Sequence, residues 1–160
     1  MLNDIIVNLP DGQAEKNLVR YLKNHSEVDK ESIIIRLLEH DSDCVRASVL
    51  KITPRVVTDK NLLYKILDMG LAKKNISGVK LWLKATVAGL GYKKMLKHMK
   101  FVAESHPDWI AYVWYHLVPM VLKDAPDCVS ILDEIKAITE NNICNELKDF
   151  WEGNKNSVLY

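Results

Sequence analysis

The chain has 160 residues, of which 48% are hydrophobic and 27% charged, and its formal net charge is +1. These values are typical of a soluble globular protein long enough to bury a core, and they exclude a strong overall charge that would indicate a polyanionic partner. The three cysteines are widely spaced, which favours free thiols in a reducing compartment over a disulfide framework.

Apolar residues recur at helical spacing along the first half of the chain, and strand-like alternation is scarce. After the turn at residues 8–12, this spacing predicts helices over residues 13–25 and 32–40. A third helix runs through Val45, Val49 and Ile52 and is expected to stop before Pro54. A fourth, over residues 62–72, is expected to be capped by Asp59.

The second half continues the helical pattern. The spacing predicts helices over residues 79–90 and 92–103. Residues 105–108 are a start signal for a further helix, with Pro107 in its first turn. That helix is apolar nearly all round, so we expect it to be buried, and Pro119 is expected to kink or divide it. Further helices are expected from residue 127 through Ile138 and over residues 143–151.

The tripeptide Asp-Cys-Val occurs twice, at residues 43–45 and 127–129, and Val79-Lys80 opens a helix between them. The three segments lie about 42 residues apart on average, a spacing typical of stacked two-helix repeats. In both copies we expect the aspartate to cap a helix and the cysteine and valine to face the core.

These segments resemble HEAT repeats over roughly residues 30–140. The best matches are residues 37–46 and 119–129. After the second match, Ser130 stands where a basic residue is usual. In the middle copy, residues 75–78 stand in place of the acidic turn. The resemblance implies an all-α fold, a short α-solenoid of antiparallel helical pairs with about three repeats, which binds macromolecules along one face. We therefore expect one domain over residues 1–160. Its parts would be an N-terminal capping helix (1–30), HEAT-like pairs (31–139), a C-terminal capping helix (140–152) and a flexible tail (153–160).

Lysines are concentrated in the middle of the chain. Residues 69–103 contain eight lysines and no acidic residue, whereas residues 104–160 contain ten acidic residues and four lysines. The spacing places Lys80 and Lys84 on one helix face, and Lys93, Lys97 and Lys100 on another. Such faces either bind phosphate or an acidic protein surface, or form the solvated sides of two amphipathic helices.

The prediction from these features is a non-enzymatic module that binds a protein partner, as an adaptor or a toxin-neutralising immunity protein. Trp82 lies off the apolar stripe of its helix, so we expect an exposed aromatic contact residue, whereas Trp109 and Trp114 are expected in the core. The predicted binding residues are Arg46, Lys80, Trp82, Lys84, Lys93, Lys97 and Lys100. The alternative is nucleic-acid or phosphate binding through the lysine-rich segment 73–100, which the shortage of base-reading arginines disfavours.

Patterns for catalysis or metal binding are missing from the sequence. The five histidines lack ligand spacing with one another and with the cysteines, and no nucleophile elbow or phosphate-binding glycine loop occurs. His116 is expected to be a satisfied core histidine. We predict no enzymatic activity, no cofactor and no metal, and the sequence leaves the oligomeric state open.

Two features bear on the location of the protein. Residues 1–4 lack the basic start of a signal peptide, and no apolar run approaches the roughly 18 residues of a membrane span. We therefore expect a cytoplasmic protein without a membrane partner.

Overall fold

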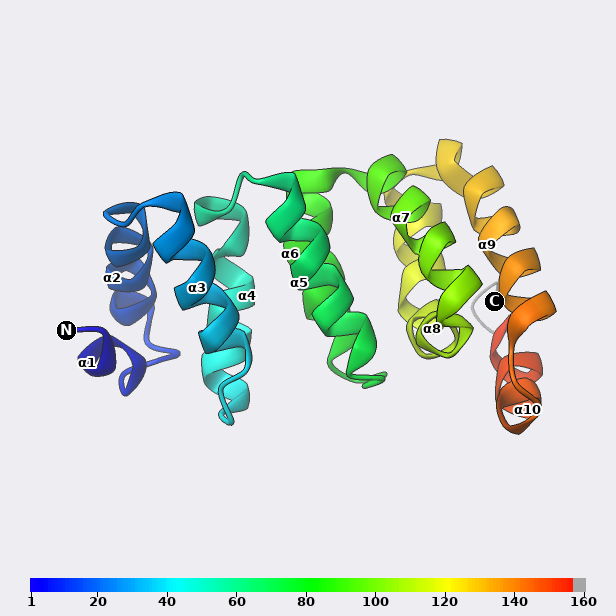
Figure 1. Ribbon diagram of the computed structural model, residues 1–160, viewed down its shortest axis with the longest axis horizontal. Helices are drawn as coiled ribbons and strands as arrows, with labels where there is room; N and C mark the ends of the chain where they lie inside the picture. The colour runs from blue at the N-terminus through cyan, green and yellow to red at the C-terminus, as the bar shows by residue number, and fades with distance from the viewer. Residues whose placement is uncertain (157–160) are drawn as a thin grey trace. The chain divides into compact units, whose positions relative to one another are not determined.

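The computed structural model describes residues 1–156, and over this range the chain is all-helical, without strands. The predicted all-α class is therefore confirmed. The chain divides into two compact units, Met1–Leu63 and Tyr64–Tyr160 (Figure 1). Helix α5 (Lys60–Ala72) begins at the end of the first unit and continues into the second.

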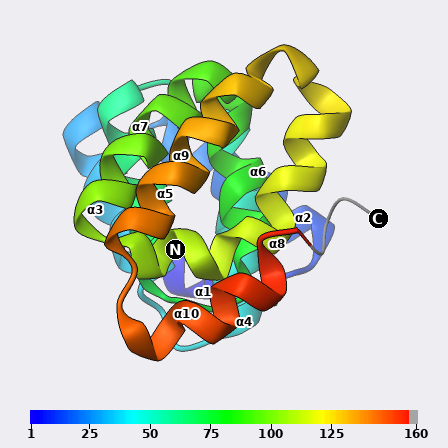
Figure 2. The ribbon, with the colours of Figure 1, turned by 90° about the vertical axis from the view of Figure 1, so that its right-hand side faces the viewer.

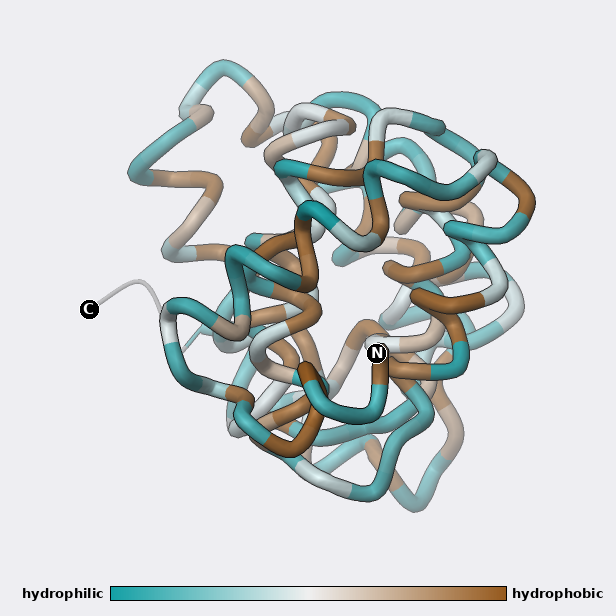
Figure 3. The backbone as a smooth tube through the Cα atoms, turned by 90° about the vertical axis from the view of Figure 1, so that its left-hand side faces the viewer, coloured by the Kyte–Doolittle hydropathy of each residue, from teal (hydrophilic) through white to brown (hydrophobic). Residues whose placement is uncertain are grey.

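The first unit contains α1 (Leu2–Ile6), α2 (Gly12–Lys23), α3 (Glu27–Leu38) and α4 (Asp43–Val56). Helix α2 contacts α1, α3 and α4, and α3 also packs against α4. Its apolar core includes Leu18, Leu22, Ile34, Leu38 and Ile52. Figure 3 shows this unit from its N-terminal side, where hydrophilic and hydrophobic stretches alternate along the chain, as expected of amphipathic helices.

The second unit contains α6 (Val79–Leu90), α7 (Tyr92–Ser105), α8 (Pro107–Asp124), the short 3₁₀ helix η1 (Pro126–Cys128), α9 (Val129–Asn142) and α10 (Asn145–Asn154). Helix α7 lies alongside α9, and α8 contacts α6, α7, α9 and α10 (Figure 2). The core of the unit includes Leu83, Met95, Met99, Ile110, Leu117 and Ile135.

Pro54 does not end its helix as the sequence predicts, and Pro119 does not divide its helix. Helix α4 continues through Pro54 to Val56, and α8 is one helix across Pro119. A proline inside a helix removes one backbone hydrogen bond. Val118 and Met120 on either side of Pro119 are buried.

Helix starts show where the predictions of helix limits hold and where they fail. Asp59 caps α5 as predicted, since its Oδ1 accepts hydrogen bonds from the backbone N–H groups of Asn61 and Leu62 at 2.7 and 3.3 Å. Helix α3 starts five residues before the predicted residue 32, behind the cap residue Ser26. Helix α1 was not expected.

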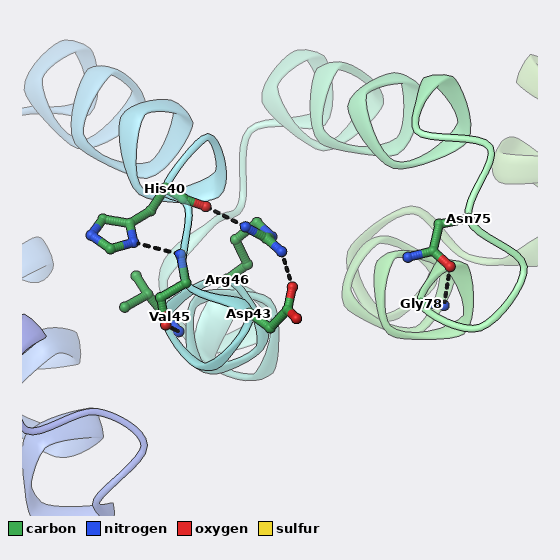
Figure 4. A network of polar contacts seen from close by, with 7 residues as sticks. His40, Asp43, Val45, Arg46, Asn75 and Gly78 are labelled. Carbon is green, nitrogen blue, oxygen red and sulfur yellow. Dashed lines mark hydrogen bonds and ion pairs between the residues drawn. The ribbon is translucent and has the colours of Figure 1, made fainter.

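The two Asp-Cys-Val copies differ, and the predicted roles of their first two residues are partly wrong. Ser42 caps α4, and Cys44 is exposed. Asp43 pairs with Arg46 (Figure 4). In the second copy Cys128 is buried. Helix α9, which follows Asp127, has no side-chain cap hydrogen bond, so the second aspartate does not cap a helix either. The serine hydroxyl reaches the N–H group of the third helical residue, which leaves the first aspartate free to face solvent.

The predicted flexible tail begins within a helix. Residues 153 and 154 belong to α10, and Lys155 forms ion pairs with Glu140 and Glu152 at 3.1 and 2.8 Å. These two hydrogen-bonded carboxylates raise the pKa of Lys155. Residues 157–160 of the predicted tail lie outside the described residues.

Candidate binding groove between α6 and α8

Trp82 is not an exposed contact residue, which corrects the expectation from the sequence. Its exposed fraction is 5%. It packs so closely on α5 that a Cβ atom added to Gly70 would lie 2.5 Å from the Cβ of Trp82. The ammonium of Lys73 lies over the indole ring, 5.6 Å from its centroid. Trp82 therefore anchors α6 to α5, because α6 buries a second face beyond its Val79–Leu83 stripe.

Lys80 and Lys84 both line a groove of about 590 Å³, called here the α6–α8 groove. Four residues of its lining come from α6 and the start of α7: Lys80, Lys84, Val87 and Tyr92. The other six lie in α8, at spacings that place them along one side of that helix: Tyr115, His116, Pro119, Met120, Lys123 and Asp124. The volume lies within the range of ordinary ligand sites.

Three lysines and one carboxylate line this groove, so its formal charge is positive. Lys80, Lys84 and Lys123 are exposed, and among residues 1–156 none of them has a hydrogen-bond or ion-pair partner. Asp124, the acidic residue of the lining, accepts a hydrogen bond of 2.7 Å from the hydroxyl of Tyr92. Burial of the ring, together with this hydrogen bond, raises the pKa of Tyr92, so the hydroxyl stays protonated at neutral pH.

Between the lysines the groove is apolar and aromatic. Val87 and Met120 line it, Met120 being largely buried, and half of the surface of Tyr115 is exposed. The ring of His116 meets that of Tyr115 edge-on, with centroids 5.3 Å apart. His116 is half-buried at the groove rather than enclosed in the core. The groove thus combines lysines on both helices with a surface that can bury apolar side chains.

The remaining predicted lysines lie elsewhere in the second unit. Lys93, Lys97 and Lys100 line a smaller hollow of about 380 Å³, called here the α7–α9 groove, together with Asp127, Cys128, Ser130, Ile131 and Glu134. There Lys100 pairs with Glu134 at 2.8 Å.

Lys74 is also paired, with Asp108 at 2.6 Å, and this hydrogen bond raises its pKa. With Lys100 paired as well, the lysine-rich segment 73–100 is therefore not one free cationic surface.

Arg46 belongs to the first unit, where it stabilises the turn between α3 and α4. Its guanidinium donates to the carboxylate of Asp43 and to the backbone carbonyl of His40 (Figure 4). The ring Nδ1 of His40 accepts from the backbone N–H of Ser42 at 3.0 Å. The turn before α6 is closed differently, by Asn75, whose Oδ1 accepts from the N–H groups of Ser77 and Gly78 at 3.1 and 3.3 Å (Figure 4).

Sequence reasoning missed the part of the groove that α8 contributes. Tyr115, Pro119 and Lys123 follow one another at intervals of four residues, on a helix whose other positions are mostly apolar. This interrupted pattern was the available signal. The predicted core position of Trp114 is confirmed by its burial, whereas Trp109 is half-buried and stacks on His106 with centroids 4.0 Å apart.

Comparisons with protein-family models, curated proteins and solved structures found no match for this chain. The fold places it in the all-α class. Over residues 1–156, no helix combines the length and apolar character needed to cross a bilayer. The same residues contain no group of three or more acidic, histidine or cysteine side chains arranged to hold a metal ion.

Proposed function

We propose that this chain is a non-enzymatic binding module that takes an acidic segment of a partner protein into the α6–α8 groove. The observation that carries the proposal is a set of three lysines that lie on two facing helices and have no partner among residues 1–156. They border the apolar surface of Val87 and Tyr115. An adaptor and a toxin-neutralising immunity protein are two forms that such a module takes.

We also propose that the helices stack as HEAT-like pairs. Helices that follow one another along the chain contact each other within both units, as in α1 with α2, α3 with α4, α6 with α7 and α8 with α9. A stack of such pairs presents grooves between helices, and grooves of this kind bind extended partners.

The mixed character of the groove favours a protein segment over nucleic acid. A nucleic-acid backbone gains affinity chiefly from phosphate contacts, and it would leave the aliphatic surface of the groove unfilled. An acidic peptide can pair its carboxylates with Lys80, Lys84 and Lys123 and bury apolar side chains between them. No arginine lines the groove, and arginine is the usual reader of base edges.

Fluorescence anisotropy tests the proposal with three labelled probes of equal charge. They are a 12-residue peptide of glutamate and leucine, a peptide of glutamate and serine, and a single-stranded oligonucleotide. We expect the glutamate–leucine peptide to bind best, with an affinity that falls as salt is added. The variant Lys80→Gln/Lys84→Gln/Lys123→Gln should weaken this binding about tenfold, since each exposed charge pair contributes a fraction of the total.

The matched control is Lys93→Gln/Lys94→Gln/Lys97→Gln, which removes the same charge from α7. Its affinity for the peptide should stay close to that of the unchanged protein. Equal losses in both variants would show a non-specific charge effect and contradict the proposal. Tighter binding of the oligonucleotide than of either peptide would support the nucleic-acid alternative instead.

A further inference from the structure

Helices α2 and α4 of the first unit carry more basic than acidic side chains. Six of their residues are basic, namely Lys16, Arg20, Lys23, Arg46, Lys51 and Arg55. With Asp11, which caps α2, they carry three acids, Asp11, Glu15 and Asp43, so six basic and three acidic residues give a formal charge of +3. Glu15 pairs with Lys51 at 2.9 Å, and Asp43 pairs with Arg46. Both acids within the helices thus have a basic partner, and the remaining charge is positive.

The contact between α2 and α4 determines the side on which these residues lie. Glu15 is buried there and accepts a hydrogen bond of 3.3 Å from the hydroxyl of Ser48, so each of these side chains points toward the other helix. Lys51 follows Ser48 by three positions and reaches Glu15 from the solvent, since 70% of its side chain is exposed. Helix α3 packs on both α2 and α4. Exposed side chains close to this contact therefore lie on the side away from α3.

Helical spacing adds three more basic residues to this side. Arg55 follows Lys51 by one turn on α4. On α2, the position after Glu15 is turned by about 100° from it, so Lys16 and, seven positions later, Lys23 share one exposed side of the helix. The four residues Lys16, Lys23, Lys51 and Arg55 are called here the α2–α4 basic face.

Three of these four side chains are available to a ligand. Lys16, Lys23 and Arg55 are exposed, and among residues 1–156 they have no hydrogen-bond or ion-pair partner. The fourth, Lys51, is the partner of the buried Glu15. Arg20 lies at the edge of the face, where it also borders the hollow between α1 and α2. The face therefore offers three free cations on two neighbouring helices.

The face lacks the apolar surface at which protein partners usually bind. Among residues 1–156, none of the large hydrophobic side chains that are exposed lies in α2 or α4. Protein interfaces bury an apolar core, and single-stranded nucleic acids stack their bases on aromatic side chains. The phosphates of a nucleic-acid duplex need neither of these surfaces, because they bind through their charge.

The distribution of the cations over two helices matches the two strands of a duplex. Lys16 and Lys23 lie seven positions apart, which is about 10 Å along α2. Three phosphates of one DNA strand cover about the same length, at about 3.4 Å each. The axes of packed helices lie about 8–10 Å apart, so the cations of α2 and α4 fall on either side of a minor groove about 6 Å wide. An anionic membrane, whose charged headgroups diffuse laterally, would gain nothing from this spacing.

We propose that the α2–α4 basic face binds double-stranded DNA through its phosphates, without reading the base sequence. Lys16 and Lys23 contact one strand, and Lys51 and Arg55 contact the other strand across the minor groove. Contacts to phosphate fix the position of a protein on the duplex and carry no direct sequence information. This inference does not depend on the α6–α8 groove, which shares no residue with the face.

A salt titration of the full chain with a labelled DNA duplex of about 20 base pairs tests this site. Each cation that neutralises a phosphate adds about −0.9 to the slope of log affinity against log salt concentration. The four residues of the face predict a slope of about −3.6, which is a loss of about 150-fold in affinity between about 50 and 200 mM salt. Lys16→Gln/Lys23→Gln/Arg55→Gln should make the slope shallower by about 2.7. Lys51 stays in place because its partner Glu15 is buried.

Lys93→Gln/Lys94→Gln/Lys97→Gln is the matched control, because it removes the same charge from α7. It should leave the slope unchanged. Equal changes of slope in the two variants, or no binding of the duplex at low salt, would overturn the proposal. It would also be overturned if a single strand of equal length, an RNA duplex with its wide minor groove, or phosphatidylserine vesicles bound as tightly as the DNA duplex. Thermal melting of each variant verifies the fold.

Discussion

The α6–α8 and α7–α9 grooves begin from the same kind of sequence and end in different electrostatic states. Each has lysines four residues apart on one helix, Lys80 and Lys84 in the first and Lys93 and Lys97 in the second. The facing helix α8 adds Lys123 and apolar surface to the first groove. The facing elements of the second groove add Asp127 and Glu134.

The spacing of lysines along one helix determines which face of that helix they lie on. Whether they are available to a ligand depends on the acidic residues of the facing helix. Carboxylates close to lysines satisfy them internally, as Glu134 does for Lys100. In the α6–α8 groove the acidic residue of the lining, Asp124, is instead engaged by Tyr92. Three lysines and one carboxylate line the α6–α8 groove, against three lysines and two carboxylates in the α7–α9 groove.

The largest expected effect concerns the packing of α6 on α5, which positions Lys80 and Lys84. Trp82→Ala should lower the free energy of unfolding by about 3–5 kcal/mol, because it removes a buried indole that packs on Gly70. Urea unfolding followed by circular dichroism measures the change. Leu81→Ala, at a half-exposed neighbour on the same helix, should cost far less. Equal losses of unfolding free energy in the two variants would mean that Trp82 is a surface residue and does not pack on α5.

A second test changes the same contact, between Gly70 and Trp82, on the α5 side. Gly70→Ala places a methyl group within 2.5 Å of the Cβ and Cγ atoms of Trp82, which cannot move aside without shifting α6. We expect a loss of about 1–3 kcal/mol in unfolding free energy, the usual cost of overpacking. Gly153→Ala is the control, since no atom lies within 4 Å of its added Cβ. A neutral effect of Gly70→Ala on unfolding would contradict the close contact.

Removing the neutralising acids should convert the second groove into a copy of the first. The variant Asp127→Asn/Glu134→Gln releases Lys100 and leaves three lysines without carboxylates in the α7–α9 groove. The loss of the exposed ion pair should cost at most about 1 kcal/mol of stability. Calorimetry with the glutamate–leucine peptide should then show two binding sites rather than one.

The control for this variant is Glu104→Gln/Asp133→Asn, which removes two exposed acids that do not line the groove. It should keep one site. A single site in both variants would show that neutralisation by neighbours is not what separates the two grooves.

The sequence predicts the helices well, because their apolar spacing and caps are local properties. Asp59 is an example, since its cap depends only on the residues that follow it. Apolar periodicity also placed Lys80 and Lys84 correctly on a solvent-facing side of α6.

The environment of a side chain depends on contacts that local patterns do not contain. The sequence predicts an exposed Trp82 because it shows one buried stripe on α6. In the structure α6 buries a second face, which contains Trp82 and packs on Gly70 of α5. Tyr115 and Lys123 were missed because their relation to α6 exists only once α6 and α8 pack together. The pairing of Lys100 with Glu134, 34 positions away, is equally invisible to helical periodicity.

The smallest expected effect concerns the hydrogen bond between Tyr92 and Asp124 in the α6–α8 groove. Burial and the hydrogen bond to Asp124 raise the pKa of Tyr92 in the folded chain above its ordinary value of about 10. The folded state therefore holds the phenol proton more tightly than the unfolded state. The resulting stability is fully present below pH 10 and is lost as the pH rises toward the folded-state pKa.

Ultraviolet titration of tyrosine ionisation checks this pair. Asp124→Asn should lower the pKa of Tyr92 part of the way toward 10, because the charged acceptor is removed while the burial remains. The same variant should raise peptide affinity in the α6–α8 groove by about twofold, the size expected for one exposed charge. Tyr92→Phe should make the unfolding free energy fall less steeply above pH 10. An unchanged Tyr92 titration in Asp124→Asn would mean that Tyr92 does not bond to Asp124 and would contradict this pair.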